Sequence, residues 1–339
     1  MKRIRTALVV LLSISILSVG CGAKQEPSLE PLPEEKKLVV YTSHKAEIYE
    51  PFIQEFEDRT GIWVEVYAAG SNEILEKVAS EADKPEADVV FGGGADSLHA
   101  YTSYFEPYQV RCREQITSEY APADDSFTLF SEFPIVFVYN KKLVFSAGTP
   151  QGWSELLEGK WKGKIAFANP ANSGSAYTAL CTMLSVCQDQ KDRTEVMERF
   201  AGNLNGELCK SSAEVMDEVI SGSRAVGITT EDEVKKYEDQ GMDIGIVYPK
   251  DGTAVVPDGT AIVKGAKHME NAKLFLEFTV CEDAQNLIQD YGYRRSIRDD
   301  LKTDLTVNTI RYDMDWAQES REEILKDFED AFSEKEVQP

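Results

Sequence analysis

The chain has 339 residues, and its 36 lysines and arginines against 59 aspartates and glutamates give a formal net charge of −23. This acidity excludes nucleic acid as a partner, because binding to a phosphate backbone requires a basic surface. Six cysteines without a CxxC spacing and only three histidines also argue against a zinc or haem site. We therefore expect neither a metal nor a cofactor.

The N-terminus carries the features of a lipoprotein export signal. Three basic residues precede an apolar run, residues 7–19, that is too short to span a bilayer comfortably. A glycine then precedes Cys21. We expect residues 1–20 to be removed as a signal peptide and a lipid to be attached to Cys21, so that the protein is anchored to the membrane outside the cytoplasm, in the periplasm or on the cell surface.

A polar tether and an alternating α/β pattern follow. Residues 21–36 include QEPSLEPLPEEK, whose prolines and glutamates cannot form a core. Strands then alternate with helices, which indicates a parallel α/β sheet. The expected strands are 37–41, 63–67 and 88–91, and the expected helices are 46–57 and 73–81.

A second α/β unit begins after the longer apolar run FPIVFVYN, residues 133–140. Its expected strands are 164–167, 225–228 and 244–248, and its expected helices are 176–185, 194–200 and 213–220. If FPIVFVYN carries the chain out of the first unit and GIVYPKDGT carries it back, two adjacent crossings join the units and permit a hinge. The chain therefore divides into two lobes.

The remaining elements complete this division. VVPDGTAIV, residues 255–263, predicts a hairpin with Asp258 and Gly259 at its turn. Helices are expected over 270–278, 283–291 and 316–332. We assign residues 37–135 and 252–310 to lobe one, 136–251 to lobe two, and 311–335 to a C-terminal helix that packs on the lobes.

Small, polar or glycine-rich loops follow four of the predicted strands. Ligands of open α/β sheets bind beyond the carboxyl ends of strands, and the N–H groups at helix N-termini attract anions. Each loop also has a structural interpretation, as a helix cap or a tight turn. Their recurrence in both halves predicts a pocket between the lobes. The loops are Thr42 to His44, Gly92 to Ser97, Asn172 to Ser175, and Thr229 to Asp232.

Enzymatic motifs do not match this sequence. GGGADS is not followed by GKS or GKT and does not fit the dinucleotide fingerprint, and there is no GxSxG, HExxH or SxxK motif. A secreted phosphoester hydrolase, with His44 acting as a base near Ser173 or Ser175, is the enzymatic alternative. We expect a binding protein and not an enzyme.

Six segments together resemble extracellular solute-binding proteins of bacterial ABC importers, in the branch that includes ferric-iron, phosphonate and sugar-phosphate binders. The resemblance covers nearly all of the mature chain. It implies a two-lobe type II periplasmic-binding fold, in which each lobe has a mostly parallel sheet flanked by helices and two crossing strands join the lobes. It also implies delivery of a solute to a membrane permease, and we expect the receptor to be monomeric. The segments are LVVYTSHKAEIYEPFIQEFEDRTGIWVEV, ADVVFGGGADSL, WKGKIAFANPANSGSAYTAL, AVGITTEDEVKKY, VYPKDGTAVVPDGTAIVKGAKHMENAKLF and YRRSIRDDL.

The loops look most like those of the binders of phosphorylated solutes. By that resemblance, a phosphate or phosphonate is held by lobe one and lobe two together, glycines allow close approach, and the last loop accepts hydrogen bonds from the rest of the solute. Arg294 is expected to approach the anion or to pair with Asp299 or Asp300. The residues expected to bind the ligand are Thr42, Ser43, His44, Gly93, Gly94, Ser173, Gly174, Ser175, Thr230, Glu231, Asp232 and Tyr248.

Ferric iron is the alternative ligand. Iron binders of the family usually carry adjacent tyrosines in the second lobe, whereas the matching segment here is GITTEDEVKKY. Glu231, Asp232, His44 and a bound anion could still supply oxygen and nitrogen ligands.

Overall fold

The computed structural model describes residues 33–116, 118, 120–145, 148–188, 192–302 and 307–336. The predicted signal peptide, the lipidation site at Cys21 and residues 21–32 of the tether lie outside the described residues. Within the described ranges, no helix combines the length and the apolar character needed to cross a membrane.

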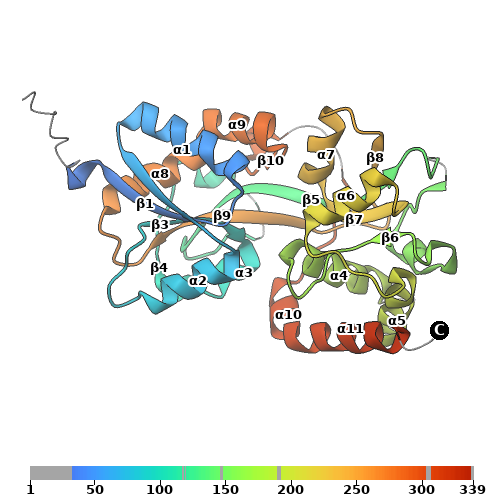
Figure 1. The fold of residues 1–339 in the computed structure, drawn as a ribbon. Helices are drawn as coiled ribbons and strands as arrows, with labels where there is room; N and C mark the ends of the chain where they lie inside the picture. Colours follow the sequence, from blue (N-terminus) through green and yellow to red (C-terminus); the bar gives the residue numbers. More distant parts are fainter. Residues whose placement is uncertain are drawn as a thin grey trace, which may run out of the picture. The chain divides into compact units, whose positions relative to one another are not determined.

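The first lobe is built on a sheet with the strand order β2-β1-β3-β9-β5 (Figure 1). β1 pairs in parallel with β2 and β3, whereas β9 runs antiparallel to both β3 and β5. Short strands β4 and β10 pair with β9 and β5. The strands are β1 (Lys37–Thr42), β2 (Trp63–Ala68), β3 (Val89–Gly94), β4 (Phe105–Glu106), β5 (Thr128–Asn140), β9 (Val255–Val263) and β10 (Arg295–Ser296).

The second lobe uses the far half of β5. That half pairs antiparallel with β7 and β8, and β6 pairs in parallel with β7. The chain returns to the first sheet between β8 and β9, so two adjacent crossings join the two sheets, as predicted. The strands added here are β6 (Ile165–Ala166), β7 (Val226–Thr230) and β8 (Ile244–Val247).

Helices flank both sheets (Figure 1). Those of the first lobe are α1 (Ala46–Thr60), α2 (Ser71–Ser80), α3 (Ala95–His99), α8 (Met269–Thr279) and α9 (Glu282–Gly292). Those of the second lobe are α4 (Gly174–Cys187), α5 (Arg193–Leu204), α6 (Ser212–Ser221), α7 (Glu231–Asp239), α10 (Met314–Glu319) and α11 (Arg321–Glu336). Single 3₁₀ turns are η1 (Glu34–Lys36), η2 (Thr102–Tyr104), η3 (Arg113–Gln115), η5 (Trp153–Leu157), η6 (Gly159–Trp161) and η7 (Asp299–Leu301).

Two separate hydrophobic cores support the two lobes. In the first, α1 buries one apolar face, including Phe52 and Phe56, against Phe91 of β3 and the neighbouring aromatic rings. In the second, Phe167 and Phe200 pack edge to face. Because each lobe has its own core, the lobes can move against each other without exposing either core. The predicted two-lobe α/β fold class is confirmed. The sheets are mixed and not mostly parallel, because β9 and the long strand β5 run antiparallel to their neighbours. The predicted domain boundaries remain a prediction.

The predicted hairpin at Asp258 and Gly259 is wrong, because β9 is one continuous strand through both residues. Asp258 pairs with Ser131 of β5 and with Gly94 of β3, so β9 has a neighbour on each side there. An Asp-Gly pair favours a turn only where the chain is free to reverse, and strand pairing overrides that local preference here.

The single helix predicted over residues 316–332 is also inaccurate, because the chain forms two helices that are separated at Ser320. The first turn of α10 is capped by Asp313, whose carboxylate accepts a hydrogen bond from Trp316 N at 2.9 Å. Ile324 and Phe328 of α11 then pack into the second core. The C-terminal pair therefore packs mainly on lobe two, while α10 also contacts α3 of lobe one.

Candidate functional site

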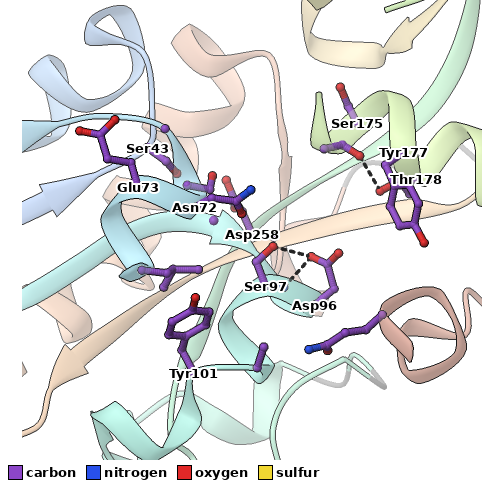
Figure 2. A pocket seen from close by; sticks show the side chains of 18 of the residues that line it. Ser43, Asn72, Glu73, Asp96, Ser97, Tyr101, Ser175, Tyr177, Thr178 and Asp258 are labelled. Atoms are coloured by element: carbon purple, nitrogen blue, oxygen red, sulfur yellow. Dashed lines mark hydrogen bonds between the residues drawn. The ribbon is translucent and has the colours of Figure 1, made fainter. Parts of the chain in front are cut away.

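A cavity of about 500 Å³ lies where helix N-termini of both lobes face each other (Figure 2). Lobe one contributes Ser43 and His44 after β1, Gly93 and Gly94 at the end of β3, and the starts of α2 and α3. Lobe two contributes the start of α4 and the junction between α10 and α11. The cavity has the size of a site for a small solute.

Ser43 and His44 converge on Gly92. The backbone φ of Gly92 is +102°, a value that side chains other than glycine rarely adopt. A Cβ placed on Gly92 would lie 2.8 Å from Ser43 Oγ and 3.0 Å from His44 Nε2. The absence of a side chain at Gly92 therefore leaves room for a hydroxyl and an imidazole nitrogen to come together beside the cavity.

His44 is a buried, neutral hydrogen-bond donor. Its Nδ1 lies 3.4 Å from Nη1 of Arg294, and because a guanidinium can only donate, Nδ1 must accept and Nε2 must carry the proton. Nε2 has no hydrogen-bond partner among the described residues, because the nearest carboxylate oxygen, Asp258 Oδ2, lies 3.6 Å away. Burial, together with the charge of Arg294, lowers the pKa of His44 well below its ordinary value. The unused N–H group is thus available to a ligand atom without adding a net charge.

Arg294 is already neutralised by carboxylates. Its guanidinium pairs with Asp258 and, at 3.0 Å, with Asp232, and it lies 4.7 Å from the ring centroid of Phe133. The pairing with Asp299 or Asp300 that the sequence suggested is wrong, because Asp300 pairs with Arg298 and Asp299 with Lys302. Burial raises the pKa of Asp258, and Arg294 opposes that rise.

The SGS turn both caps a helix and lines the cavity. Ser173 Oγ accepts a hydrogen bond from Ala176 N at 3.3 Å, as the N-cap of α4. Gly174 and Ser175 line the cavity, and Ser175 Oγ lies 3.2 Å from Ser173 Oγ and 3.0 Å from Ser212 Oγ. The first turn of α4 therefore presents hydroxyl and backbone donors to a ligand.

The other predicted site residues lie outside the cavity lining. Thr42 Oγ1 donates to the carbonyl of Phe91 at 2.7 Å, and Thr230 ends β7 in a buried position. Glu231 is fully buried against Arg295 and Tyr248. The structure thus places Thr42, Thr230, Glu231, Asp232 and Tyr248 in the connections around the cavity.

α7 is joined to lobe one by four ion pairs among the described residues. Two involve more exposed side chains of α1 and the residue before it, and two involve Arg294 and Arg295. Since α7 follows β7 of the second sheet, these contacts connect the two lobes directly. The pairs are Lys45–Glu233, Glu47–Lys236, Arg294–Asp232 and Arg295–Glu231.

The lining residues that were missed from the sequence include two polar groups. Ser71, Asn72 and Glu73 begin α2, and their segment AAGSNE follows a strand with the same small polar character as the four loops identified, so it could have been found. Gln318 and Arg321 come from the C-terminal helices. No local pattern distinguishes them from other polar residues of an acidic helix.

Known proteins are similar to this chain over most of its length. The Synechocystis sp. protein named iron uptake protein A1 is 25% identical over 305 residues, which are 86% of this chain and 84% of the relative. The Salmonella typhi protein named putative 2-aminoethylphosphonate-binding periplasmic protein is 21% identical over 75% of each chain.

Solved structures show the same two-lobe fold. The periplasmic binding protein AfuA from Actinobacillus pleuropneumoniae, with exogenous fructose-6-phosphate bound, has a TM-score of 0.76 at 25% identity and covers 88% of this chain and 98% of its own. The apo ferric ion-binding protein A of Pasteurella haemolytica has a TM-score of 0.78 at 17% identity, covering 87% and 98%.

The family itself is recognised over most of the chain. Residues 52–316 match the family described as bacterial extracellular solute-binding protein. Its members bind solutes outside the cytoplasm and serve transport. This confirms that the chain acts as a binding protein and not as an enzyme. The chain belongs to the bacterial extracellular solute-binding proteins.

Proposed function

We propose that this protein is the receptor of an ABC importer for an anionic organic solute, a sugar phosphate or a phosphonate, which it holds in the cavity between its lobes. The observation that carries the proposal is the convergence of Ser43 Oγ and the unpartnered Nε2 of His44 at Gly92, with α4 beginning on the other wall. Neutral donors and helix N-termini can hold a buried anion despite the acidic surface of the protein.

Binding by lobe closure follows from the position of these donors. Ser43 and His44 belong to lobe one, whereas Gly174 and Ser175 belong to lobe two. A solute that contacts both walls stabilises the closed arrangement by its higher affinity for that arrangement, and the permease recognises it. β5 and the connection from β8 to β9 are the two crossings and provide the hinge.

Ferric iron is the second candidate. Glu73, Asp96 and Tyr101 line the cavity and would offer oxygen ligands, and a relative is named for iron uptake. Against it, burial raises the pKa of Tyr177, whose hydroxyl already donates to the carbonyl of Ala317, so this lining tyrosine is a poor phenolate donor. In the described part of the chain, no three His, Cys, Asp or Glu residues are grouped as a metal site.

A thermal-shift screen distinguishes the two ligands. A solute that binds only the folded state raises the melting temperature. We expect glucose 6-phosphate, fructose 6-phosphate or 2-aminoethylphosphonate to raise it, and ferric citrate to leave it unchanged without producing a visible phenolate band. A shift with ferric citrate alone, accompanied by such a band, would replace the proposed ligand with iron. Phosphate release from a probe that binds would instead favour the hydrolase alternative.

We also propose that Cys21 carries the lipid that anchors the receptor as a monomer beside its permease. The export signal ahead of Cys21 supports this proposal. Cys21→Ser is expected to move the protein from the membrane fraction to the soluble extracytoplasmic fraction, while solute binding stays unchanged. Membrane retention of the variant at wild-type level, measured by fractionation and immunoblotting, would contradict lipid attachment at this residue.

A further inference from the structure

The C-terminal helices bring a cation to the cavity. Arg321, in the first turn of α11, lines the cavity together with Gln318 of α10. Its guanidinium carbon lies 4.2 Å from the ring centroid of Tyr177, a residue of α4 that is only 2% exposed. This cation–π contact with a buried ring positions the guanidinium, and the N–H groups that it does not use can reach a ligand.

Arg321 differs from Arg294 in its charge balance. Arg294 is compensated by two carboxylates, Asp258 and Asp232. Arg321 forms no ion pair with any carboxylate within the described ranges of the chain. Of the two arginines in the cavity wall, Arg321 is therefore the one whose positive charge is available to an anion.

Two helix N-termini lie at the cavity beside Arg321. α11 has 16 residues and α4 has 14, and each places its N-terminal turn at the cavity. The partial positive charges of helix N-termini favour an anion, although Glu322 and Glu323 in the first turn of α11 offset part of that effect. The hydroxyl of Tyr177 donates to the carbonyl of Ala317, which ties the stacking ring to the C-terminal segment.

We propose that Arg321 binds the anionic group of the solute from the lobe-two wall, and that α10 and α11 thereby form part of the binding site. This inference rests on the proposed function and identifies the residue that makes the site prefer a charged solute. Ser43 and His44 supply neutral donors from lobe one, so an anion reached by both walls favours closure of the lobes.

Isothermal titration of Arg321→Gln, Arg321→Lys and the wild-type protein tests the proposal, with glucose 6-phosphate and 2-aminoethylphosphonate as probes. Arg321→Gln is expected to weaken binding by about 10- to 100-fold, the effect of losing a hydrogen bond to a charged group. Arg321→Lys keeps the charge but not the planar fork, so an intermediate affinity is expected. Lys326→Gln removes an exposed charge from the same helix and is expected to leave affinity unchanged.

The salt dependence of binding separates a direct contact from a structural role. If Arg321 contacts the anion, the loss of affinity between 50 mM and 500 mM NaCl is expected to be smaller in Arg321→Gln than in the wild type, at equal melting temperatures. If Arg321→Gln lowers the melting temperature, Arg321→Lys distinguishes a direct contact from a structural role, since it keeps the aliphatic stem and the charge. An intermediate affinity in Arg321→Lys then supports the direct contact. Wild-type affinity and salt dependence in Arg321→Gln would overturn the inference and leave the proposed function standing. Failure of the wild-type protein to bind any phosphorylated or phosphonate probe would contradict both the proposed function and the inference about Arg321.

Discussion

Replacing Arg295 with methionine is expected to lower the free energy of unfolding by about 3–5 kcal/mol, the cost of leaving a buried charge without its partner. The carboxylate of Glu231 is completely buried and accepts hydrogen bonds from Arg295 at 2.8 and 2.9 Å. Tyr248 and Lys235, the other partners of Glu231, cannot replace a bidentate guanidinium. Urea unfolding followed by circular dichroism measures the change.

The pH dependence of this loss identifies Glu231 as its origin. Burial by itself raises the pKa of Glu231, but hydrogen bonds from Arg295 and Tyr248 outweigh burial and hold the pKa below 4.5. The stabilisation is therefore present above pH 4.5 and is lost as the pH falls through the lowered pKa. Without Arg295, burial raises the pKa of Glu231 instead, so the difference between wild type and variant is expected to shrink as the pH falls through that raised pKa and on through the lowered pKa of the wild type.

Two further variants test the assignment. Arg295→Met combined with Glu231→Leu removes both charges and is expected to recover most of the lost stability, because a buried ion pair contributes little over apolar packing. Arg59→Met breaks an exposed pair with Asp283 and is expected to cost less than about 1 kcal/mol. A double variant no more stable than Arg295→Met would show that the arginine acts through contacts other than Glu231.

The Arg295–Glu231 pair also affects closure of the lobes, because Arg295 belongs to β10 of the first sheet and Glu231 begins α7 of the second lobe. Breaking and reforming a desolvated pair is costly, whereas the exposed Lys45–Glu233 contact is screened by salt and can exchange at little cost. We therefore expect rotation of the lobes to keep Arg295–Glu231 intact and to pivot about it.

The sequence predicts most of the fold because periodicity reports which faces are buried. The predicted strand 37–41 and helix 46–57 correspond to β1 and α1, since the apolar spacing of each segment matches one buried face. The error at Asp258 has a different origin. A local turn preference carries no information on whether strands such as β3 and β5 will occupy both edges of the segment.

The site residues that follow predicted strands could be predicted from the sequence, whereas those brought in by contacts between distant segments could not. Ser43 and Ser175 could be identified because they follow predicted strands, and topology brings the ends of such strands together. Arg321 could not, since its access to the cavity depends on α11 folding back onto α4 across more than a hundred residues of sequence. Glu231 and Asp232 also follow a strand, but they form ion pairs with Arg295 and Arg294, which are distant in sequence. The sequence alone could not show that these carboxylates are already paired.

Replacing Gly92 with alanine is expected to reduce the affinity for glucose 6-phosphate by more than about tenfold and the free energy of unfolding by about 1–3 kcal/mol. The φ of +102° is strained for alanine, and the new Cβ would lie 2.8 Å from Ser43 Oγ and 3.0 Å from His44 Nε2. Both donors must then move away from the position in which they converge.

Gly61→Ala provides the matched control for backbone strain. Gly61 also has a positive φ, +66°, but a Cβ there would meet nothing within 4 Å, and this residue ends α1 away from the cavity. We expect this variant to lose stability without losing affinity when both are measured by thermal unfolding and isothermal titration. If Gly92→Ala loses stability but binds the probe as tightly as Gly61→Ala does, Ser43 and His44 do not hold the solute. If its affinity falls while Gly61→Ala binds normally, the loss comes from displacement of these two donors, because strain at a positive φ is common to both variants.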